Sequence, residues 1–304
     1  MSGFAYLFPG QGAQAVGMGK AFYDRFEESR ELYKRAATHV GFDVAALCFE
    51  GPQEELTKTE KCQPALFVTS LAAFAAFQRV APQIRVVGGA GLSLGELTAL
   101  AAAEAMTFRD ALHVVQARAE AMTACALRHP GAMLAVIGLS NDVIREICQQ
   151  AEVVAANFNA ADQVVLSGTV PAIEEAERLA KAQGATRAVR LDVSGAFHSP
   201  LMREASEKFR KVLEKVRITT PRFPVISNVT GKPIEGAEAI RELLPKQMVS
   251  PVLWESSMRG MIAAGAAVFV EFPPARVLTA LLRRIDRSVK GIAAHEPADF
   301  DALS

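Results

Sequence analysis

The sequence predicts an α/β fold in which a large subdomain with a parallel sheet carries a small subdomain as an insertion. Three observations lead to this prediction. Short apolar runs alternate with helical stretches near the start of the chain, and this texture resumes in its last third. The middle segment instead has the strand and helix order of a compact βαββαβ unit. Finally, a chain of 304 residues that is 50% apolar can bury a substantial core.

The first segment provides the start of the large subdomain. Apolar periodicity predicts strands at residues 4–8 and 85–87 and helices at residues 65–80 and 94–105. A further helix is expected from residue 108, because Thr107 and Asp110 have the spacing of a capping box. Strands that alternate with helices in this way favour a parallel sheet.

The pattern of apolar runs and helical stretches changes after Pro130, and the first pattern returns near residue 197. Between them the pattern predicts strands at 133–137, 153–156, 163–166 and 186–191, and helices at 141–150 and 172–183. This order is that of a ferredoxin-like fold. Strands at 224–227 and 267–271 then belong to the first kind of pattern. We therefore expect a large subdomain formed by residues 1–128 and 197–304 and a small one formed by residues 129–196.

Composition excludes several classes of function. Lys plus Arg number 33 and Asp plus Glu number 33, so nothing favours nucleic acid or an anionic membrane as a partner. The first residues lack the features of a signal peptide, and no apolar run is long enough to cross a membrane. The four cysteines lack metal-binding or disulfide-type spacing, which suits reduced thiols: Cys48, Cys62, Cys125 and Cys148. We expect a soluble, cytoplasmic protein.

Ser93 is the first candidate for chemistry. It lies in GLSLG, a Gly-x-Ser-x-Gly pattern that follows a predicted strand and opens a predicted helix. Gly91 and Gly95 permit a sharp turn and close approach of neighbouring segments, while the helix amino terminus presents free N–H groups to a developing negative charge. The alternative is that Ser93 only caps the helix, since Ser is a favoured N-cap residue.

A serine nucleophile needs a base, and His198 is the histidine whose position stands out. It lies in VSGAFHSPLM, where the chain leaves the predicted small subdomain, and Ser199 and Pro200 begin a helix directly after it. A histidine at such a junction can also cap a helix or form a core hydrogen bond. The hypothesis of a base depends on the other motifs.

Arg118 lies on the apolar face of the helix expected from residue 108, together with Val114, Val115 and Met122. An unpaired buried charge is very costly, so its guanidinium needs a route to water or an anionic partner. Either it reaches solvent or forms a structural salt bridge, or it binds a substrate carboxylate, for which the two-pronged guanidinium is well suited.

Near the amino terminus, Gly10 and Gly12 flank Gln11 in FPGQGAQ, at the end of the first predicted strand. A loop of this kind can bring a backbone N–H close to the oxyanion that forms when Ser93 attacks a carbonyl. Considered alone, the pattern is only a glycine-rich turn.

Taken in order, these motifs resemble those of the malonyl-CoA:acyl carrier protein transacylases and the related acyltransferase domains of fatty acid and polyketide synthases. The matching stretches are LFPGQGAQAVGMG, GLSLGE, Arg118, NFNAADQVVLSG, GAFHSPLM and KQMVSPVLW. They span nearly the whole chain, and such an ordered set is far more specific than any one member. The resemblance implies an α/β-hydrolase-like large subdomain and a ferredoxin-like small one.

The resemblance also implies a role for each matching residue. Ser93 is the nucleophile, and His198 is its general base and then acid. Gln11 and Leu94 supply backbone N–H groups to an oxyanion hole. Gln247 orients His198 through its backbone carbonyl, in place of the Asp of a hydrolase triad.

The remaining implied residues bind the substrate. Arg118 pairs with the malonyl carboxylate, and Asn159, from the NFNAADQVVLSG stretch, lies in the substrate site. Phe197 takes a position that excludes α-branched extender units, which favours malonyl over methylmalonyl.

The implied reaction moves malonyl from malonyl-CoA to the phosphopantetheine thiol of an acyl carrier protein, in fatty acid or polyketide synthesis. It needs no metal or redox cofactor, since the phosphopantetheine belongs to the partner. We expect a monomer. Basic residues that can meet an acidic carrier protein, or form merely solvated faces, are Arg203, Lys208, Arg210, Lys211, Lys215, Arg217, Arg283, Arg284 and Arg287.

Two departures from the family pattern bear on these expectations. Leu92 stands where the family usually has His before the nucleophile, from which we expect an altered rate rather than loss of function. The Pro273-Pro274-Ala275 stretch replaces one that is usually richer in glycine, which affects the expected loop geometry.

Two other functions remain open. A serine hydrolase or thioesterase would need an acidic residue to orient His198, and Asp162 and Asp192 are the candidates. A non-catalytic module that binds carrier proteins is the other alternative, suggested by Leu92.

Overall fold

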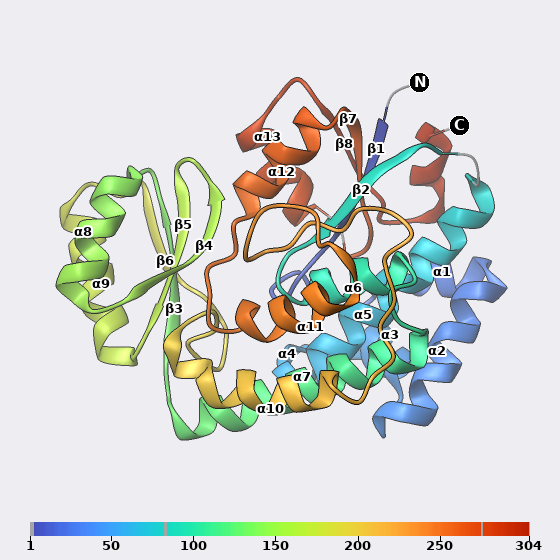
Figure 1. Ribbon diagram of the computed structural model, residues 1–304, viewed down its shortest axis with the longest axis horizontal. Helices are drawn as coiled ribbons and strands as arrows, with labels where there is room; N and C mark the ends of the chain where they lie inside the picture. Colours follow the sequence, from blue (N-terminus) through green and yellow to red (C-terminus); the bar gives the residue numbers. More distant parts are fainter. Residues whose placement is uncertain (1–2, 82–83, 275, 304) are drawn as a thin grey trace.

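The computed structural model describes residues 3–81, 84–274 and 276–303. Its described strands form two four-stranded sheets that lie in separate parts of the molecule, with most helices packed around the larger part (Figure 1). The first sheet combines strands from both ends of the chain, and the second uses only the middle segment. The α/β fold with a parallel sheet and a separate small sheet is confirmed. The exact subdomain boundaries, at residues 128/129 and 196/197, stay a prediction.

The large sheet has the order β2-β1-β7-β8, and each pair of neighbouring strands is parallel. Its strands are β1 (Gly3–Phe8), β2 (Val86–Gly91), β7 (Ala266–Glu271) and β8 (Lys290–Ala293). The parallel arrangement places the carboxyl ends of β1 and β2 side by side, with Phe8 opposite Gly91. The loops that follow these two strands carry Gln11 and Ser93, so the sheet brings the two candidates to one edge.

The strand expected at residues 224–227 is wrong. Val225 and Ile226 each form only an isolated bridge, to Gly89 and Pro233 respectively. Pro224 has no N–H to donate to a ladder, and the chain turns back at once, since Gly231 N donates to the Ser227 carbonyl. The segment therefore lies beside β2 without extending the sheet.

Helices cover the large sheet. The amino-terminal half supplies α1 (Lys20–Arg25), α2 (Glu27–Val40), α3 (Val44–Glu50), α4 (Gln53–Thr57), α5 (Thr59–Val80), α6 (Leu94–Ala102) and α7 (Phe108–Arg128). Helix α5 is buried along most of its length, which explains its nearly continuous apolar sequence. Helix α7 begins as expected: Thr107 Oγ1 accepts from Asp110 N at 3.1 Å. Helix α6 ends at Ala102, earlier than expected, since Glu104 takes a positive φ of 56°.

The small sheet is antiparallel in the order β4-β5-β3-β6. Its strands are β3 (Ala132–Ile137), β4 (Val154–Ala160), β5 (Gln163–Gly168) and β6 (Arg187–Arg190), and its helices are α8 (Asn141–Ala151) and α9 (Val170–Ala182). Alternate strand residues such as Leu134 and Val136 pack with Ile144, Ile147 and Ile173 in a separate apolar cluster. The βαββαβ order is present as the sequence predicted.

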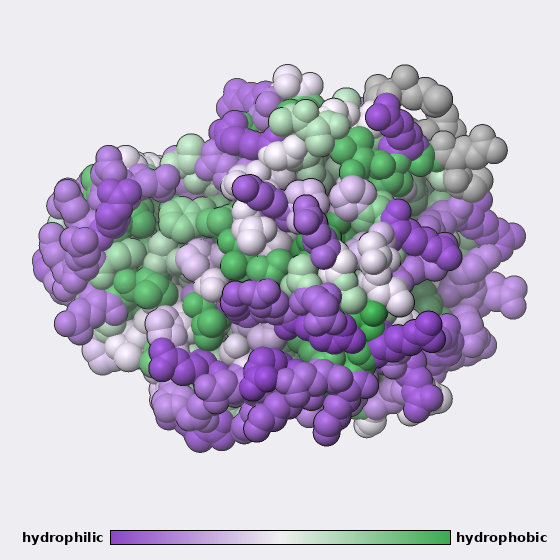
Figure 2. All heavy atoms as spheres, viewed as in Figure 1, coloured by the Kyte–Doolittle hydropathy of each residue, from purple (hydrophilic) through white to green (hydrophobic). Residues whose placement is uncertain are grey.

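The chain returns to the large part through a short 3₁₀ turn (Pro200–Met202) and α10 (Arg203–Leu213). It continues with α11 (Gly236–Gln247), α12 (Trp254–Ala263), α13 (Val277–Ile285) and a final 3₁₀ turn (Pro297–Leu303). Hydrophilic side chains gather over α10 along the lower edge in Figure 2, while apolar ones show between the small and large parts. None of the described helices is long and apolar enough to cross a membrane.

Candidate active site

Ser93 occupies a strained turn between β2 and α6, with φ 54° and ψ −103°. The two glycines of the motif are required by close approach. A Cβ at Gly91 would lie 1.9 Å from the Gly95 carbonyl carbon, and one at Gly95 would lie 2.0 Å from the Phe8 carbonyl oxygen. Gly91 is thus required by the turn itself and Gly95 by the contact of the turn with β1. The Ser93 side chain makes no capping bond to α6.

His198 contacts the serine directly. Its Nε2 lies 2.8 Å from Ser93 Oγ, and its Nδ1 lies 2.7 Å from the backbone carbonyl oxygen of Gln247, the last residue of α11. A carbonyl can only accept, so Nδ1 carries the proton and Nε2 is free to accept from the serine hydroxyl. Burial lowers the pKa of His198 to about 4, assisted by the charge of Arg118. At neutral pH the imidazole is therefore uncharged and able to act as a base.

The guanidinium of Arg118 also contacts the Ser93 hydroxyl, and this side chain is only 1% exposed. Its Nη1 donates to Gln63 Oε1 at 2.7 Å, and its Nη2 donates to Ser93 Oγ and to Gln247 Oε1, both at 2.9 Å. Burial lowers its pKa to about 10, so it stays charged at neutral pH. Throughout the described residues, no carboxylate lies within 4 Å of this guanidinium, and its buried Nε has no partner. The sequence left open that Arg118 reaches solvent or forms a structural salt bridge. In the described structure its guanidinium does neither.

A buried polar network beneath Ser93 was missed by sequence reasoning. Ser93 N donates to Asn228 Oδ1 at 2.7 Å, and Asn228 Nδ2 donates back to the Gly91 carbonyl at 2.8 Å. Gln63 and Glu96 complete the network through Arg118 and Gln247 respectively. The only sequence signal was Glu96, a charge within an alanine-rich, otherwise apolar helix.

These residues open into a cavity of about 490 Å³ between the small sheet and the loops of the large one. The sequence-predicted residues that line it are Gln11, Ser93, Leu94, Arg118, Asn159, Phe197 and His198. Gln247 lies behind Arg118 and His198. In the described part of the chain, the N–H groups of Gln11 and Leu94 donate no hydrogen bond, and the buried Asn159 Oδ1 accepts none. The cavity wall therefore carries two backbone donors without a partner among the described residues, while Asn159 Oδ1 is enclosed and unpartnered there.

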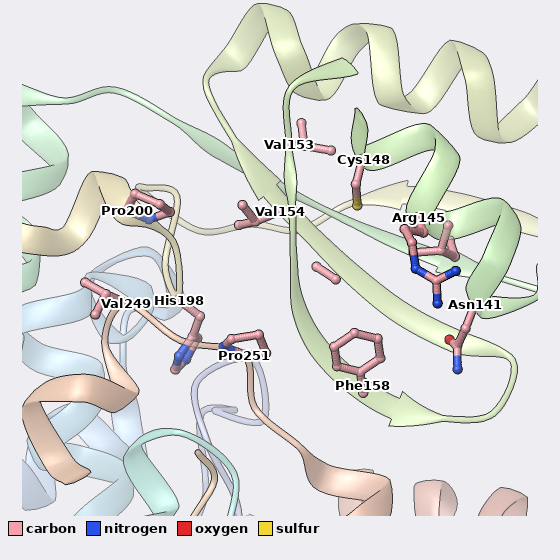
Figure 3. Close-up of a pocket in the computed structure, with 12 residues that line it drawn as sticks. Asn141, Arg145, Cys148, Val153, Val154, Phe158, His198, Pro200, Val249 and Pro251 are labelled. Carbon is pink, nitrogen blue, oxygen red and sulfur yellow. The ribbon is translucent and has the colours of Figure 1, made fainter. Parts of the chain in front are cut away.

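His198 also borders a second cavity, of about 510 Å³, on the side of α8 and β4 (Figure 3). Its walls are mainly apolar, including Phe158, Val249 and Pro251. Asn141 and Arg145 approach it from α8, as the close-up shows. Ser93 does not line it.

The acidic residue needed for a hydrolase triad is not at His198. Asp162 accepts from Arg284 at 2.6 Å on the surface, and Asp192 is exposed near the mouth of the first cavity. Leu92 is partly buried in the wall of that cavity. Ala275 lies outside the described residues, while the neighbouring Pro273 carbonyl accepts from Ser70 Oγ at 2.6 Å.

The parallel sheet, the strained serine with its histidine, and the buried guanidinium are the arrangement expected of an enzyme that handles acyl groups. Comparison with known families agrees, because the family model for the acyl transferase domain matches residues 5–298. The chain belongs to this acyl transferase family and is an acyltransferase.

Individual relatives are similar over their full lengths. The malonyl CoA-acyl carrier protein transacylase of Bacillus subtilis is 40% identical over 308 residues, across 99% of this chain and 96% of that protein. The crystal structure of an acyl carrier protein S-malonyltransferase from Vibrio cholerae covers 100% of both chains with a TM-score of 0.95 at 36% identity. A malonyl-transacylase in complex with a type II PKS acyl-carrier protein gives a TM-score of 0.96 at 36% identity, over 99% of this chain and 98% of that one. The family expected from the sequence motifs is confirmed.

Proposed function

We propose that this acyltransferase moves a malonyl group from malonyl-CoA to the phosphopantetheine thiol of an acyl carrier protein, through a malonyl-serine intermediate. The observation that carries this proposal is Arg118: a buried guanidinium without an ion-pair partner among the described residues, held 2.9 Å from the nucleophile. A site built this way favours an acyl group that brings its own carboxylate. The names of the relatives point to the same substrate.

In the first half-reaction, His198 Nε2 accepts the proton of Ser93 as Oγ attacks the thioester carbonyl. The hydrogen bond from Arg118 Nη2 favours the developing negative charge on Oγ. The free N–H groups of Leu94 and Gln11 are the donors for the tetrahedral oxyanion. The C–S bond then breaks, the His198 proton goes to the sulfur, and CoA leaves as a thiol.

The second half-reaction reverses these steps with another thiol. His198 accepts the proton of the carrier's phosphopantetheine thiol, whose sulfur attacks the serine ester, and the proton returns to Ser93 as the malonyl thioester departs. The Gln247 carbonyl stabilises the protonated histidine in both halves, since it accepts from Nδ1 throughout.

Arg118 also selects the acyl group. Once its guanidinium binds the malonyl carboxylate, the acyl chain has a fixed direction relative to Ser93, which favours transfer over random attack by water. Phe197, 5% exposed in the cavity wall, limits the room beside the acyl carbon and so disfavours branched groups. Asn159 also lines this cavity, and its side chain is a candidate contact for the substrate.

We also propose that the enzyme works as a cytoplasmic monomer without a resident cofactor. Exchange of one thioester for another requires no redox step, and one chain supplies nucleophile, base and anion partner, so a monomer without a resident cofactor suffices. Reduced, mostly buried cysteines suit the cytoplasm. The basic residues of α10 and α13 are the candidate contacts for the acidic carrier protein.

Intact mass spectrometry after mixing with malonyl-CoA tests the proposed function. A malonyl-enzyme that persists until a phosphopantetheine-bearing carrier protein is added, and then transfers its label, is the expected result. Rapid release of free malonate would instead identify a hydrolase. No labelling at all would identify a binding module.

A further inference from the structure

Glu96 is a fully buried carboxylate that the reaction above does not use. It lies in the first turn of α6, beneath the serine. Its Oε2 accepts from Gln247 Nε2 at 2.6 Å and from Asn228 N at 3.1 Å, and its Oε1 has no partner among the described residues. A buried charge supported only by neutral groups is expensive, so its retention beside a nucleophile calls for an explanation.

The side-chain amide of Gln247 links Glu96 to Arg118 through its two ends. Nε2 donates to Glu96 and to the Ser93 carbonyl at 3.0 Å, while Oε1 accepts from Arg118 at 2.9 Å. An amide can turn over and exchange these ends. When ionised, Glu96 can only accept, as the Ser93 carbonyl also does, so both contacts favour the orientation that keeps the oxygen end toward the guanidinium.

We propose that Glu96 is a positioning residue: by fixing the amide of Gln247, it holds Arg118 beside Ser93 through a neutral acceptor and leaves the guanidinium charge available to the substrate. This inference rests on the proposed function, because the charge is kept available for the malonyl carboxylate.

An indirect arrangement has an advantage over a direct ion pair. If Glu96 bound Arg118 itself, the malonyl carboxylate would have to displace it. With Gln247 between them, the two buried charges still stabilise each other, since Glu96 raises the pKa of Arg118 and Arg118 lowers that of Glu96. Burial is the larger effect and raises the pKa of the Glu96 carboxyl group to about 7, so ionised and protonated forms are both present at neutral pH, and the ionised form is the one that orients Gln247. Arg118 Nε meanwhile stays without a partner in the described structure.

The two contacts that Gln247 makes with the catalytic groups depend on Glu96 differently. Its side-chain amide is oriented by Glu96 together with the Ser93 carbonyl, whereas its main-chain carbonyl, which holds His198, is placed by the end of α11. Loss of Glu96 therefore disturbs the arginine more than the histidine. The expected signature is a loss of selectivity for malonyl rather than a uniform loss of rate.

The experiment compares acyl-enzyme formation from malonyl-CoA and from acetyl-CoA, with kcat and KM determined separately, in the wild type, Glu96→Ala and Glu96→Gln. In Glu96→Ala the malonyl-to-acetyl ratio of kcat/KM should fall about 10- to 100-fold, mainly through the KM for malonyl-CoA, with acetyl kcat changed less than about threefold. Glu96→Gln retains an acceptor oxygen and should restore most of the ratio. Glu271→Gln is the matched control, because Glu271 is equally buried but bonds Leu278 and Thr279 at the start of α13.

Each outcome is decisive. If the wild type is malonylated but Glu96→Ala keeps its ratio, or loses malonyl and acetyl rates alike, Glu96 has no positioning role. Glu96→Gln that loses as much selectivity as Glu96→Ala overturns positioning through the acceptor, and this variant serves alone if the alanine protein does not fold. A wild type that is never malonylated overturns the proposed function, and this inference with it.

Discussion

Two cavities of nearly equal size lie on either side of His198, and only one has the features of a reaction site. The first, about 490 Å³, contains Ser93 and Arg118, and the second, about 510 Å³, is bordered mainly by apolar side chains. Volume alone would not distinguish them. What distinguishes them is the convergence of a nucleophile, a neutral base and a buried charge on one point.

The two cavities also contain contrasting arginines. Among the described residues, the buried Arg118 donates to neutral acceptors alone, while the side chain of Arg145 is 66% exposed and pairs with Asp142 at 2.8 Å. A buried guanidinium without a carboxylate is held for something that binds there, whereas an exposed pair within one helix is satisfied already. The comparison favours the first cavity as the place of the proposed reaction, and four predictions test it.

The largest effect is expected from Ser93→Ala. Removal of Oγ leaves no group that can carry the acyl ester, so malonyl-enzyme should be undetectable and transfer should fall by at least about 10,000-fold. Alanine tolerates the positive φ no worse than serine does, so the fold should persist. Intact mass measures malonyl-enzyme formation, and circular dichroism measures whether the variant is folded. A folded variant that still became malonylated would place the nucleophile elsewhere.

Arg118→Ala should have the next largest effect, and one that depends on the substrate. A malonyl carboxylate would enter the site without its partner, at a cost of about 3–5 kcal/mol, or roughly a hundredfold to several thousandfold in malonyl transfer. Transfer of acetyl, which has no carboxylate, should persist or improve. The measurement is malonyl against acetyl transfer in a variant shown to be folded. Equal losses for both substrates would mean that Arg118 has only a structural role.

The sequence alone could identify Ser93 and Arg118, because the pattern that marks each of them lies within a short stretch of the chain. Ser93 lies in a strand–turn–helix pattern whose glycines are required by backbone contacts, and Arg118 is a charge on an apolar helix face. Their signals are contained in short stretches. Motifs of this kind also gave the family, and with it the fold.

The sequence did not reveal the network beneath the serine, because those contacts join distant segments. Asn228 touches Ser93 only because the 224–233 segment lies against β2, and the sequence predicts a strand for residues 224–227 of that segment. Gln63 reaches Arg118 from a different helix. Strand β8 was not expected because it is short, with only Ile292 buried. The hydrophobic pattern of one segment does not indicate which residues of a distant segment will pack beside it.

The pH dependence of acylation should reflect the burial of His198. Since burial and Arg118 lower its pKa to about 4, the imidazole stays a base well below neutrality. Acetyl-CoA is the substrate to use, because acetyl transfer does not depend on Glu96, whose pKa is also near neutrality. The rate of acetyl-enzyme formation should not show an acid limb near 6.5, and one unit below the lowered pKa of His198 it should be about tenfold slower, because imidazolium cannot accept the serine proton. Rapid-quench acylation after a pH jump measures this limb before the protein unfolds. An acid limb centred near 6.5 would mean that the histidine is solvated as in an ordinary peptide.

Arg145→Ala should have the smallest effect, and it is the counterpart of Arg118→Ala. An exposed pair separated by one helical turn is screened by solvent, so its loss should change the free energy of unfolding by less than about 0.5 kcal/mol. Malonyl and acetyl transfer should both stay within about twofold of the wild type, because no reacting group of the proposed mechanism other than His198 lines the second cavity. Steady-state kinetics and thermal unfolding check both expectations. A selective loss of malonyl transfer in this variant would show that the malonyl group passes through or rests in the apolar cavity, and would remove the distinction between the two sides of His198.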